Sequence, residues 1–343
     1  MRLARRQPRG SMKRNNIIQA TLVQHSAFER GWARLIQCFD HAEGSVEPIC
    51  VAVVGESRTG KSRLLEEFER EHPRHRSADG VFVPVLRVKA PSKPTVKGLA
   101  EVILEKLGDP IWHKDSENAK SVRIRRLLKE CRTRMVVIDE FQHFRDKASD
   151  KVAHHVADWL KVLVDDEKIA LVVAGLPICR SIINQNEQLA GRFLGEVVMP
   201  RFDWNRESDR EEFISIVVAF QERMASQFNL PDFDEEWAFR FYCATGGLMG
   251  LLAKCLQQAA WDAEDEGRTE IALDHFQAAY QKSAWGVARP SGPGPFDRGV
   301  SVVPSADLLR RVAAIGRPVM DPAKGPRRRK PRDERLSQVL TGS

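Results

Sequence analysis

A glycine-rich stretch of eight residues, 55–62, constrains the fold of this chain more than any other feature. It fits the pattern G-x-x-x-x-G-K-[ST] and lies between an apolar run at 49–54 and a helical pattern at 61–71. In such a strand–loop–helix, the two glycines let backbone N–H groups turn toward phosphates, and the helix N-terminus adds its positive dipole. A chance glycine-rich turn is the alternative, but it does not explain this context. The predicted nucleotide-binding residues are Gly55, Glu56, Ser57, Arg58, Thr59, Gly60, Lys61 and Ser62.

A second motif supplies the acidic groups that a phosphate site needs. The apolar run 135–138 reads as a buried strand and ends in Asp139 and Glu140. We expect Lys61 to reach the β- and γ-phosphates, Ser62 to hold Mg²⁺, and Asp139 to bind the same ion directly or through water. Glu140 would orient and polarise the attacking water. The two motifs together predict Mg²⁺-dependent hydrolysis of a nucleoside triphosphate.

The order of the predicted elements indicates an α/β fold. Apolar, β-rich runs at 49–54, 81–88, 135–138, 169–174 and 197–199 alternate with helical patterns, which predicts a doubly wound, five-stranded parallel sheet. The following eighty residues are helical in pattern and predict a C-terminal lid. The predicted domains are a disordered basic N-terminus (1–16), an N-terminal helical segment (17–48), a nucleotide-binding core (49–203), a helical lid (204–286) and a flexible, Pro/Gly-rich basic tail (287–343).

Charge is distributed unevenly along the chain. The net charge is +7, but residues 1–16 and 286–343 together carry +13, which leaves −6 on the body between them. Basic ends on an acidic body favour contact with nucleic acid or an acidic partner, although tails that only increase solubility have the same composition.

Cysteine usage and hydropathy indicate the compartment. The six cysteines form no C-x-x-C pair and lie mostly in apolar runs, as expected of buried reduced thiols in a cytoplasmic protein. We expect no membrane association, because no apolar run approaches the ~20 residues of a membrane span and the N-terminus lacks the apolar stretch of a signal peptide.

One arginine is a candidate for catalysis between subunits. Arg192 lies just before the last predicted core strand. In ring-forming P-loop ATPases, an arginine at this place reaches the γ-phosphate of the neighbouring subunit, where it stabilises charge that develops in the transition state. The alternatives are a surface arginine or a helix-capping salt bridge.

The combination of motifs resembles the AAA+ family and, within it, the TniB/TnsC group of ATP-dependent regulators of DNA transposition. The resemblance covers about residues 17–285. It rests on the segments 53–62, 138–140, 173–177 (Val-Ala-Gly-Leu-Pro), 187–193 (Glu-Gln-Leu-Ala-Gly-Arg-Phe) and 244–250 (Ala-Thr-Gly-Gly-Leu-Met-Gly). It implies ATP and Mg²⁺ as cofactors and subunits that assemble on duplex DNA as a ring or a helical filament. It also implies transposase subunits and a target-selection protein as partners, with hydrolysis driving disassembly.

Two positions depart from the general AAA+ pattern. The predicted strand that ends at Gly175 lacks the usual polar sensor residue. The segment around Gly246 and Gly247 lacks the lid arginine, and Gly250 stands near the place where it would fall. Both departures suggest hydrolysis that is slow and stimulated by a partner, which suits a switch better than a motor.

The resemblance also suggests where DNA would bind, because the group tends to place its DNA contacts after the second core strand. The candidates are Lys89, Lys93 and Lys97, with Arg123 as a weaker one. Such contacts would go mainly to the phosphate backbone, so they would be salt-sensitive and largely independent of sequence. The alternative interpretation is that each of these residues is an ordinary solvated side chain with no DNA contact.

Two other functions remain open from the sequence. The first is a P-loop ATPase signalling switch with no DNA role, which predicts no duplex binding. The second is a replication or repair ATPase of the clamp-loader kind, which would need a partner clamp or helicase and whose usual sensor arginine is missing here.

Overall fold

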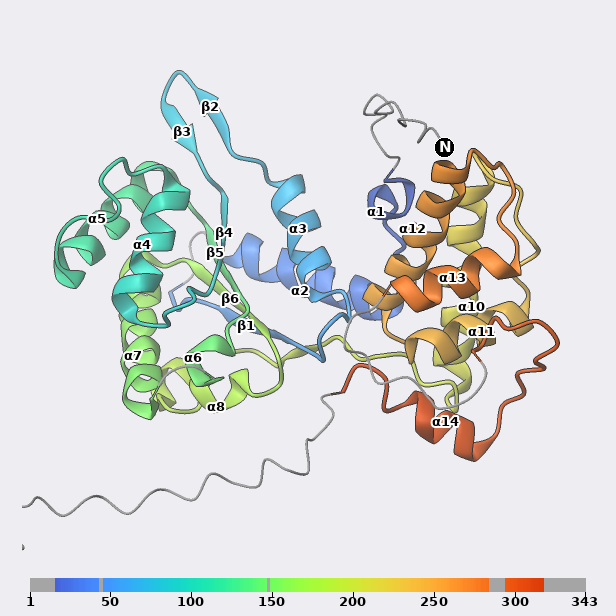
Figure 1. The fold of residues 1–343 in the computed structure, drawn as a ribbon. Helices are drawn as coiled ribbons and strands as arrows, with labels where there is room; N and C mark the ends of the chain where they lie inside the picture. Colours follow the sequence, from blue (N-terminus) through green and yellow to red (C-terminus); the bar gives the residue numbers. More distant parts are fainter. Residues whose placement is uncertain (1–15, 43–45, 147–148, 284–293, 318–343) are drawn as a thin grey trace, which may run out of the picture.

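The computed structural model describes residues 16–42, 46–146, 149–283 and 294–317. Residues 1–15 of the predicted disordered N-terminus and the basic run 325–332 of the tail lie outside these ranges. An α/β core and a helical lid lie beside each other, joined by the chain that follows the last strand of the core (Figure 1).

Five parallel strands form the central sheet, in the order β4-β5-β6-β1-β7. Every residue of the three central strands is buried, because helices cover both faces of the sheet. This confirms the predicted doubly wound fold and places the ends of β1, β5 and β6 at one edge. The strands are β1 (Cys50–Val54), β4 (Val85–Lys89), β5 (Met135–Asp139), β6 (Ala170–Gly175) and β7 (Val197–Val198).

Alternate residues of the strands enter two separate apolar clusters, one on each face of the sheet. Val51 and Val53 of β1 pack with helices α2 and α3, whereas Ala52 and Val54 pack with helices on the opposite face. The first face is covered by α2 (Ser26–His41) and α3 (Lys61–Glu71), and the second by α4 (Val96–Leu107), α5 (Glu117–Glu130), α7 (Asp150–Glu167) and α8 (Cys179–Ile183). Two short helices, α6 (His143–Asp146) and α9 (Glu187–Ala190), complete the core.

The predicted strand at 81–88 is wrong in extent. It is divided at Pro84, whose nitrogen cannot donate a hydrogen bond to a neighbouring strand. The part before it, β3 (Gly80–Phe82), pairs antiparallel with β2 (His75–Ser77), and only β4 after it joins the central sheet. The resulting hairpin projects from the core at the end of the sheet from which β4 starts (Figure 1).

The lid contains four long helices around a core rich in aromatic side chains. They are α10 (Glu207–Ala225), α11 (Glu235–Thr245), α12 (Met249–Glu266) and α13 (Leu273–Lys282). The N-terminal segment is divided between the two parts of the molecule: α1 (Ile17–Ala20) buries Ile17 and Ile18 in the lid core, whereas α2 packs on the sheet. Within the described ranges, no helix is both long and apolar enough to span a bilayer.

The C-terminal segment, residues 294–317, packs on the lid. Phe296, Val312 and Ile315 are almost fully buried among the lid helices, and the segment contains a short helix, α14 (Ala306–Val312). The tail boundary at residue 286 therefore needs correction, because this part of the predicted flexible tail belongs to the folded lid.

Candidate nucleotide-binding site

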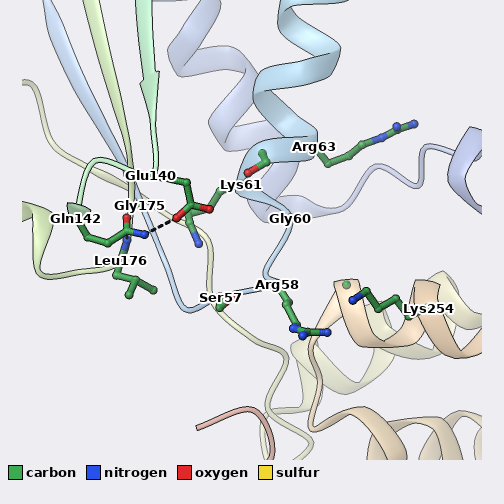
Figure 2. Close-up of a pocket in the computed structure, with 12 residues that line it drawn as sticks. Ser57, Arg58, Gly60, Lys61, Arg63, Glu140, Gln142, Gly175, Leu176 and Lys254 are labelled. Atoms are coloured by element: carbon green, nitrogen blue, oxygen red, sulfur yellow. Dashed lines mark hydrogen bonds between the residues drawn. The ribbon is translucent and has the colours of Figure 1, made fainter. Parts of the chain in front are cut away.

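A cavity of about 280 Å³ opens at the edge of the sheet where β1 and β6 end, between the P-loop (residues 55–62) and the lid (Figure 2). Residues of the P-loop, of the segment after β5, of the end of β6 and of α12 meet there. The lining residues are Ser57, Arg58, Gly60, Lys61, Ser62, Arg63, Glu140, Gln142, Gly175, Leu176, Gly250 and Lys254.

The P-loop has the strand–loop–helix geometry that the sequence predicts. A Cβ at Gly55 would lie 2.2 Å from the carbonyl oxygen of Met199, and Gly60 has a φ of +98°, so both positions require glycine. The Lys61 Nζ donates to the carbonyl oxygens of Gly55 at 3.0 Å and Glu56 at 2.6 Å. Burial lowers the pKa of Lys61, and the carboxylates of Glu140 and Asp139 oppose that shift. The two carbonyl oxygens thus fix the Lys61 ammonium at the cavity, where it can bind an anion.

Asp139 offers an oxygen that fits a Mg²⁺ site. Its Oδ1 accepts the backbone N–H of Glu140 at 2.9 Å. Its Oδ2 is buried and has no hydrogen-bond partner among the described residues, with the Arg87 Nη1 at 3.8 Å. Asp139 does not itself line the cavity, whereas Ser62 does. Carboxylate, hydroxyl and water oxygens are the ligands that Mg²⁺ prefers, so contact from Asp139 through water suits this arrangement.

Glu140 lies at the cavity in a conformation that L-residues seldom adopt. Its φ is +57°, and such backbone strain is concentrated at functional sites. Its carboxylate accepts a hydrogen bond from the Gln142 Nε2, drawn as a dashed line in Figure 2. The Gln142 Oε1 in turn accepts the N–H of Leu176 at 3.2 Å.

Gln142 packs closely against the end of β6. A Cβ at Gly175 would lie 2.2 Å from the Gln142 Oε1 and 2.7 Å from the Cys179 Sγ, so a larger residue would displace these side chains. Strand β6 lacks a polar residue at its end, as the sequence predicts, but the polar group at this place comes from Gln142. Sequence reasoning missed Gln142 because its position beside β6 depends on the fold.

The lid contributes a cation that sequence reasoning also missed. Lys254 lies on α12, one helical turn after Gly250, and lines the cavity opposite the P-loop (Figure 2). The P-loop approaches this helix closely: the Gly250 N–H donates to the Arg58 carbonyl at 2.9 Å, and a Cβ at Gly250 would lie 2.9 Å from the Arg58 Cβ. A lid cation is therefore present, although it is not an arginine and not at the position examined in the sequence.

Arg58 and Lys254 give the cavity a strong preference for anions. Neither side chain has an acidic partner among the described residues, and the Arg58 Nη1 is buried without a hydrogen bond. Burial lowers the pKa of Lys254, and the nearby positive charge of Arg58 lowers it further. Two like charges held together in this way are stabilised when an anion with several charges binds between them.

A second cavity, of about 350 Å³, adjoins the first and shares Gly60, Arg63 and Gly250 with it. Its other walls come from the N-terminal segment and the lid and are mainly apolar. They include Ile18, Leu22, Val23, Phe28, Phe220 and Met249. An apolar cavity beside a phosphate cavity has the size and polarity to hold a nucleoside base.

Arg192 lies far from this cavity in its own chain. Its carbonyl accepts the N–H of Cys50, the first residue of β1, so Arg192 is at the end of the sheet opposite the P-loop. Its side chain pairs with Asp165 at 3.2 Å and Glu47 at 3.0 Å. A catalytic role would thus require a neighbouring subunit and an exchange of these two partners.

The four predicted DNA-binding residues divide into two kinds. Lys89, Lys93 and Lys97 are exposed between the end of β4 and the start of α4, and none has an acidic partner in the described part of the chain. Arg123 is different, because it forms ion pairs with Asp109 at 3.1 Å and Asp115 at 2.8 Å. These contacts give Arg123 a structural role, so we omit it from the DNA surface considered below.

Comparison with protein families decides the classification. Residues 13–204 match the family described as "Bacterial TniB protein". The chain belongs to the TniB family. No curated protein matches this TniB-family chain in sequence.

Solved structures with a similar fold support the architecture of the TniB-family chain. The ORC2 protein of Aeropyrum pernix, solved as ADPNP–ADP complexes, has a TM-score of 0.58 at 13% identity, and the match covers 80% of this chain and 73% of that one. CDC6P of Pyrobaculum aerophilum has a TM-score of 0.58 at 14% identity, covering 79% and 72%. The ORC1 protein of A. pernix, in complex with DNA, has a TM-score of 0.54 at 16% identity, covering 79% and 69%. The shared fold is that of AAA+ ATPases.

Proposed function

We propose that this TniB-family chain is an ATP-dependent regulator of DNA transposition that assembles on target duplex DNA and recruits and activates the transposase. Hydrolysis of ATP drives disassembly. The observation that carries the proposal is the meeting of Lys61, Ser62 and Glu140 in one cavity that the lid closes with Lys254.

The two adjoining cavities suit the two ends of ATP. The phosphates would lie against the P-loop, with Mg²⁺ held by Ser62 and by Asp139 through water, and the adenine would enter the apolar cavity. When bound, Mg²⁺ would neutralise charge on the phosphates. Glu140, held by Gln142, would accept a proton from the attacking water while Lys61, Arg58 and Lys254 stabilise the phosphate charge.

We infer that the complete catalytic site forms between subunits. In its own chain Arg192 lies at the opposite end of the sheet from the nucleotide, so it would act on the ATP of a neighbouring copy. Its bonds to Asp165 and Glu47 would have to be released first. Hydrolysis would therefore be slow in isolated subunits and faster when assembly or a partner places Arg192 in the neighbouring site.

We propose that Lys89, Lys93 and Lys97 contact DNA phosphates. These lysines and the acidic pair follow neighbouring parallel strands at the same edge of the sheet, because Lys89 at the end of β4 lies beside Asp139 at the end of β5. Their charges have no acidic partner among the described residues, and an AAA+ fold is compatible with DNA binding, as ORC1 of A. pernix illustrates. With DNA bound this close to the nucleotide, ATP binding would change the affinity for DNA, and DNA binding would change the affinity for ATP.

Replacing Lys89, Lys93 and Lys97 together by alanine is expected to weaken duplex binding and flatten its salt dependence. Each lysine that contacts a phosphate contributes about 1 to the slope of log K against log [salt], so the slope falls by up to about 3. Fluorescence anisotropy of a labelled duplex with ATP, over a series of salt concentrations, measures this slope.

The matched control removes three exposed lysines elsewhere: Lys114, before α5; Lys129, on α5; and Lys151, on α7. It is expected to keep the wild-type slope. If both triple variants lose duplex affinity and salt slope equally, net charge alone explains the effect, and the assigned DNA surface is contradicted. If wild-type protein binds ATP but shows no binding to duplex DNA, the proposal is wrong and the alternative of a signalling switch without a DNA role is favoured.

A further inference from the structure

Hydrogen bonds from two largely buried arginines attach the C-terminal segment (294–317) to the rest of the molecule at two points, beside its apolar contacts with the lid and the ion pair of Arg298 with Asp274. At the first, Arg240 of α11 is buried and donates hydrogen bonds to the carbonyl oxygens of Pro295 at 2.6 Å and Val300 at 2.8 Å. These bonds hold the beginning of the segment to the lid and involve no residue of the P-loop.

At the second attachment point, Arg201 joins three parts of the chain. It follows β7 in the connection from core to lid, and its side chain is only 11% exposed. The Nε donates to the Oε2 of Glu56, the second residue of the P-loop, at 3.1 Å. The Nη1 donates to the carbonyl oxygens of Gly246 in the lid at 3.3 Å, and of Ala313 and Ile315 in the C-terminal segment at 3.2 Å and 3.0 Å.

Two glycines permit the close packing at this junction. Gly246 has a φ of +63°, and a Cβ there would lie 2.9 Å from the Val312 carbonyl oxygen and 3.2 Å from the Arg201 Nη1. Gly316 has a φ of +78°, and its Cβ would lie 2.7 Å from the Leu248 side chain. The left-handed backbone at both positions therefore favours glycine where the end of the segment packs on the lid.

Glu56 links the junction to the nucleotide cavity. Its carbonyl oxygen accepts a hydrogen bond from the Lys61 Nζ, while its carboxylate pairs with Arg201 and lies 3.9 Å from the Arg317 Nη2. A bound triphosphate would draw Lys61 away from this carbonyl and fix the P-loop backbone around the phosphates. Glu56 would then be presented to Arg201 in a single position.

We propose that Arg201 is a positioning residue that couples nucleotide binding at the P-loop to docking of the C-terminal segment. This inference rests on the proposed binding of ATP and adds a regulatory element to that site. Coupling between two sites is reciprocal, so the factor by which nucleotide stabilises the docked segment is also the factor by which docking strengthens nucleotide binding.

Hydrogen exchange measured by mass spectrometry on the full chain tests this coupling. With Mg²⁺ and a non-hydrolysable ATP analogue, amides of residues 306–317 are expected to exchange at least about fivefold more slowly, the lower end of typical coupling factors. In Arg201→Gln the slowing is expected to fall below about twofold, and the Kd for the analogue to rise by the factor that was lost. Arg201→Lys keeps the ion pair with Glu56 but reaches fewer carbonyl oxygens. Its slowing of exchange is therefore expected to lie between that of wild type and that of Arg201→Gln.

Arg240→Gln is the matched control. It removes the first attachment point, so it is expected to speed exchange near residues 295–300 with and without the analogue, while the response of 306–317 persists. Analogue binding is measured by calorimetry on the same samples. If wild-type protein binds no analogue, the proposed ATP site itself fails. If it binds the analogue and exchange at 306–317 is unchanged or faster, or if Arg201→Gln responds like wild type, the coupling is refuted.

Discussion

Lys61→Ala is expected to raise the Kd for ATP by about 30-fold to 4,000-fold. The Lys61 ammonium is buried at the phosphate cavity, and removing one partner of a buried charge pair costs about 2–5 kcal/mol. The carbonyl oxygens of Gly55 and Glu56 lose a donor in the variant, so circular dichroism must confirm that it folds. Isothermal titration calorimetry with ATP and Mg²⁺ measures the change.

Lys61→Met separates charge from packing in the same experiment. Methionine fills most of the volume of the lysine stem and lacks the ammonium, so it is expected to bind ATP as weakly as the alanine variant does. An affinity in Lys61→Met within threefold of wild type would contradict the role assigned to the Lys61 charge.

Glu140→Gln is expected to bind ATP with near wild-type affinity and to lower the rate of hydrolysis by about 10²-fold to 10⁴-fold. The amide fills the same space and its oxygen can still accept the Gln142 hydrogen bond, but it cannot take a proton from water. Assemblies on DNA are expected to persist longer for the same reason. Phosphate release and the lifetime of the DNA complex measure the two effects.

Glu105→Gln makes the same chemical change on the exposed surface of α4 and is expected to leave both quantities unchanged. Wild-type hydrolysis in Glu140→Gln would show that another group activates the water. A normal dissociation rate together with blocked hydrolysis would separate hydrolysis from disassembly.

The parts of the site that sequence predicted are those encoded by neighbouring residues. The P-loop and the acidic pair are local patterns, because a strand, a tight turn and a helix must follow one another for phosphates to be bound. Gln142, Lys254 and Arg201 reach the site only through the fold. Of these, Lys254 had a usable signal, since it stands four residues after Gly250 on a helix and so shares its face.

Two errors in the predicted fold have physical causes. The β2–β3 hairpin was missed because every residue of β2 is exposed and short exposed strands carry no apolar signal. Its turn residues, Ala78 and Asp79, are also not one of the Asn-Gly or Asp-Gly pairs that mark a two-residue hairpin turn. The segment 294–317 was predicted to be flexible from its proline and glycine content. Its few apolar residues are nevertheless spaced so that Phe296, Val312 and Ile315 each enter the lid core.

Electron microscopy of the protein with duplex DNA, ATP and Mg²⁺ tests the central claim most directly. The account predicts rings or helical filaments on the duplex for wild-type protein, longer-lived ones for Glu140→Gln, and none for Lys61→Ala or for wild type without nucleotide. Isolated monomers on DNA in every condition, or equal assemblies in Lys61→Ala, would contradict it.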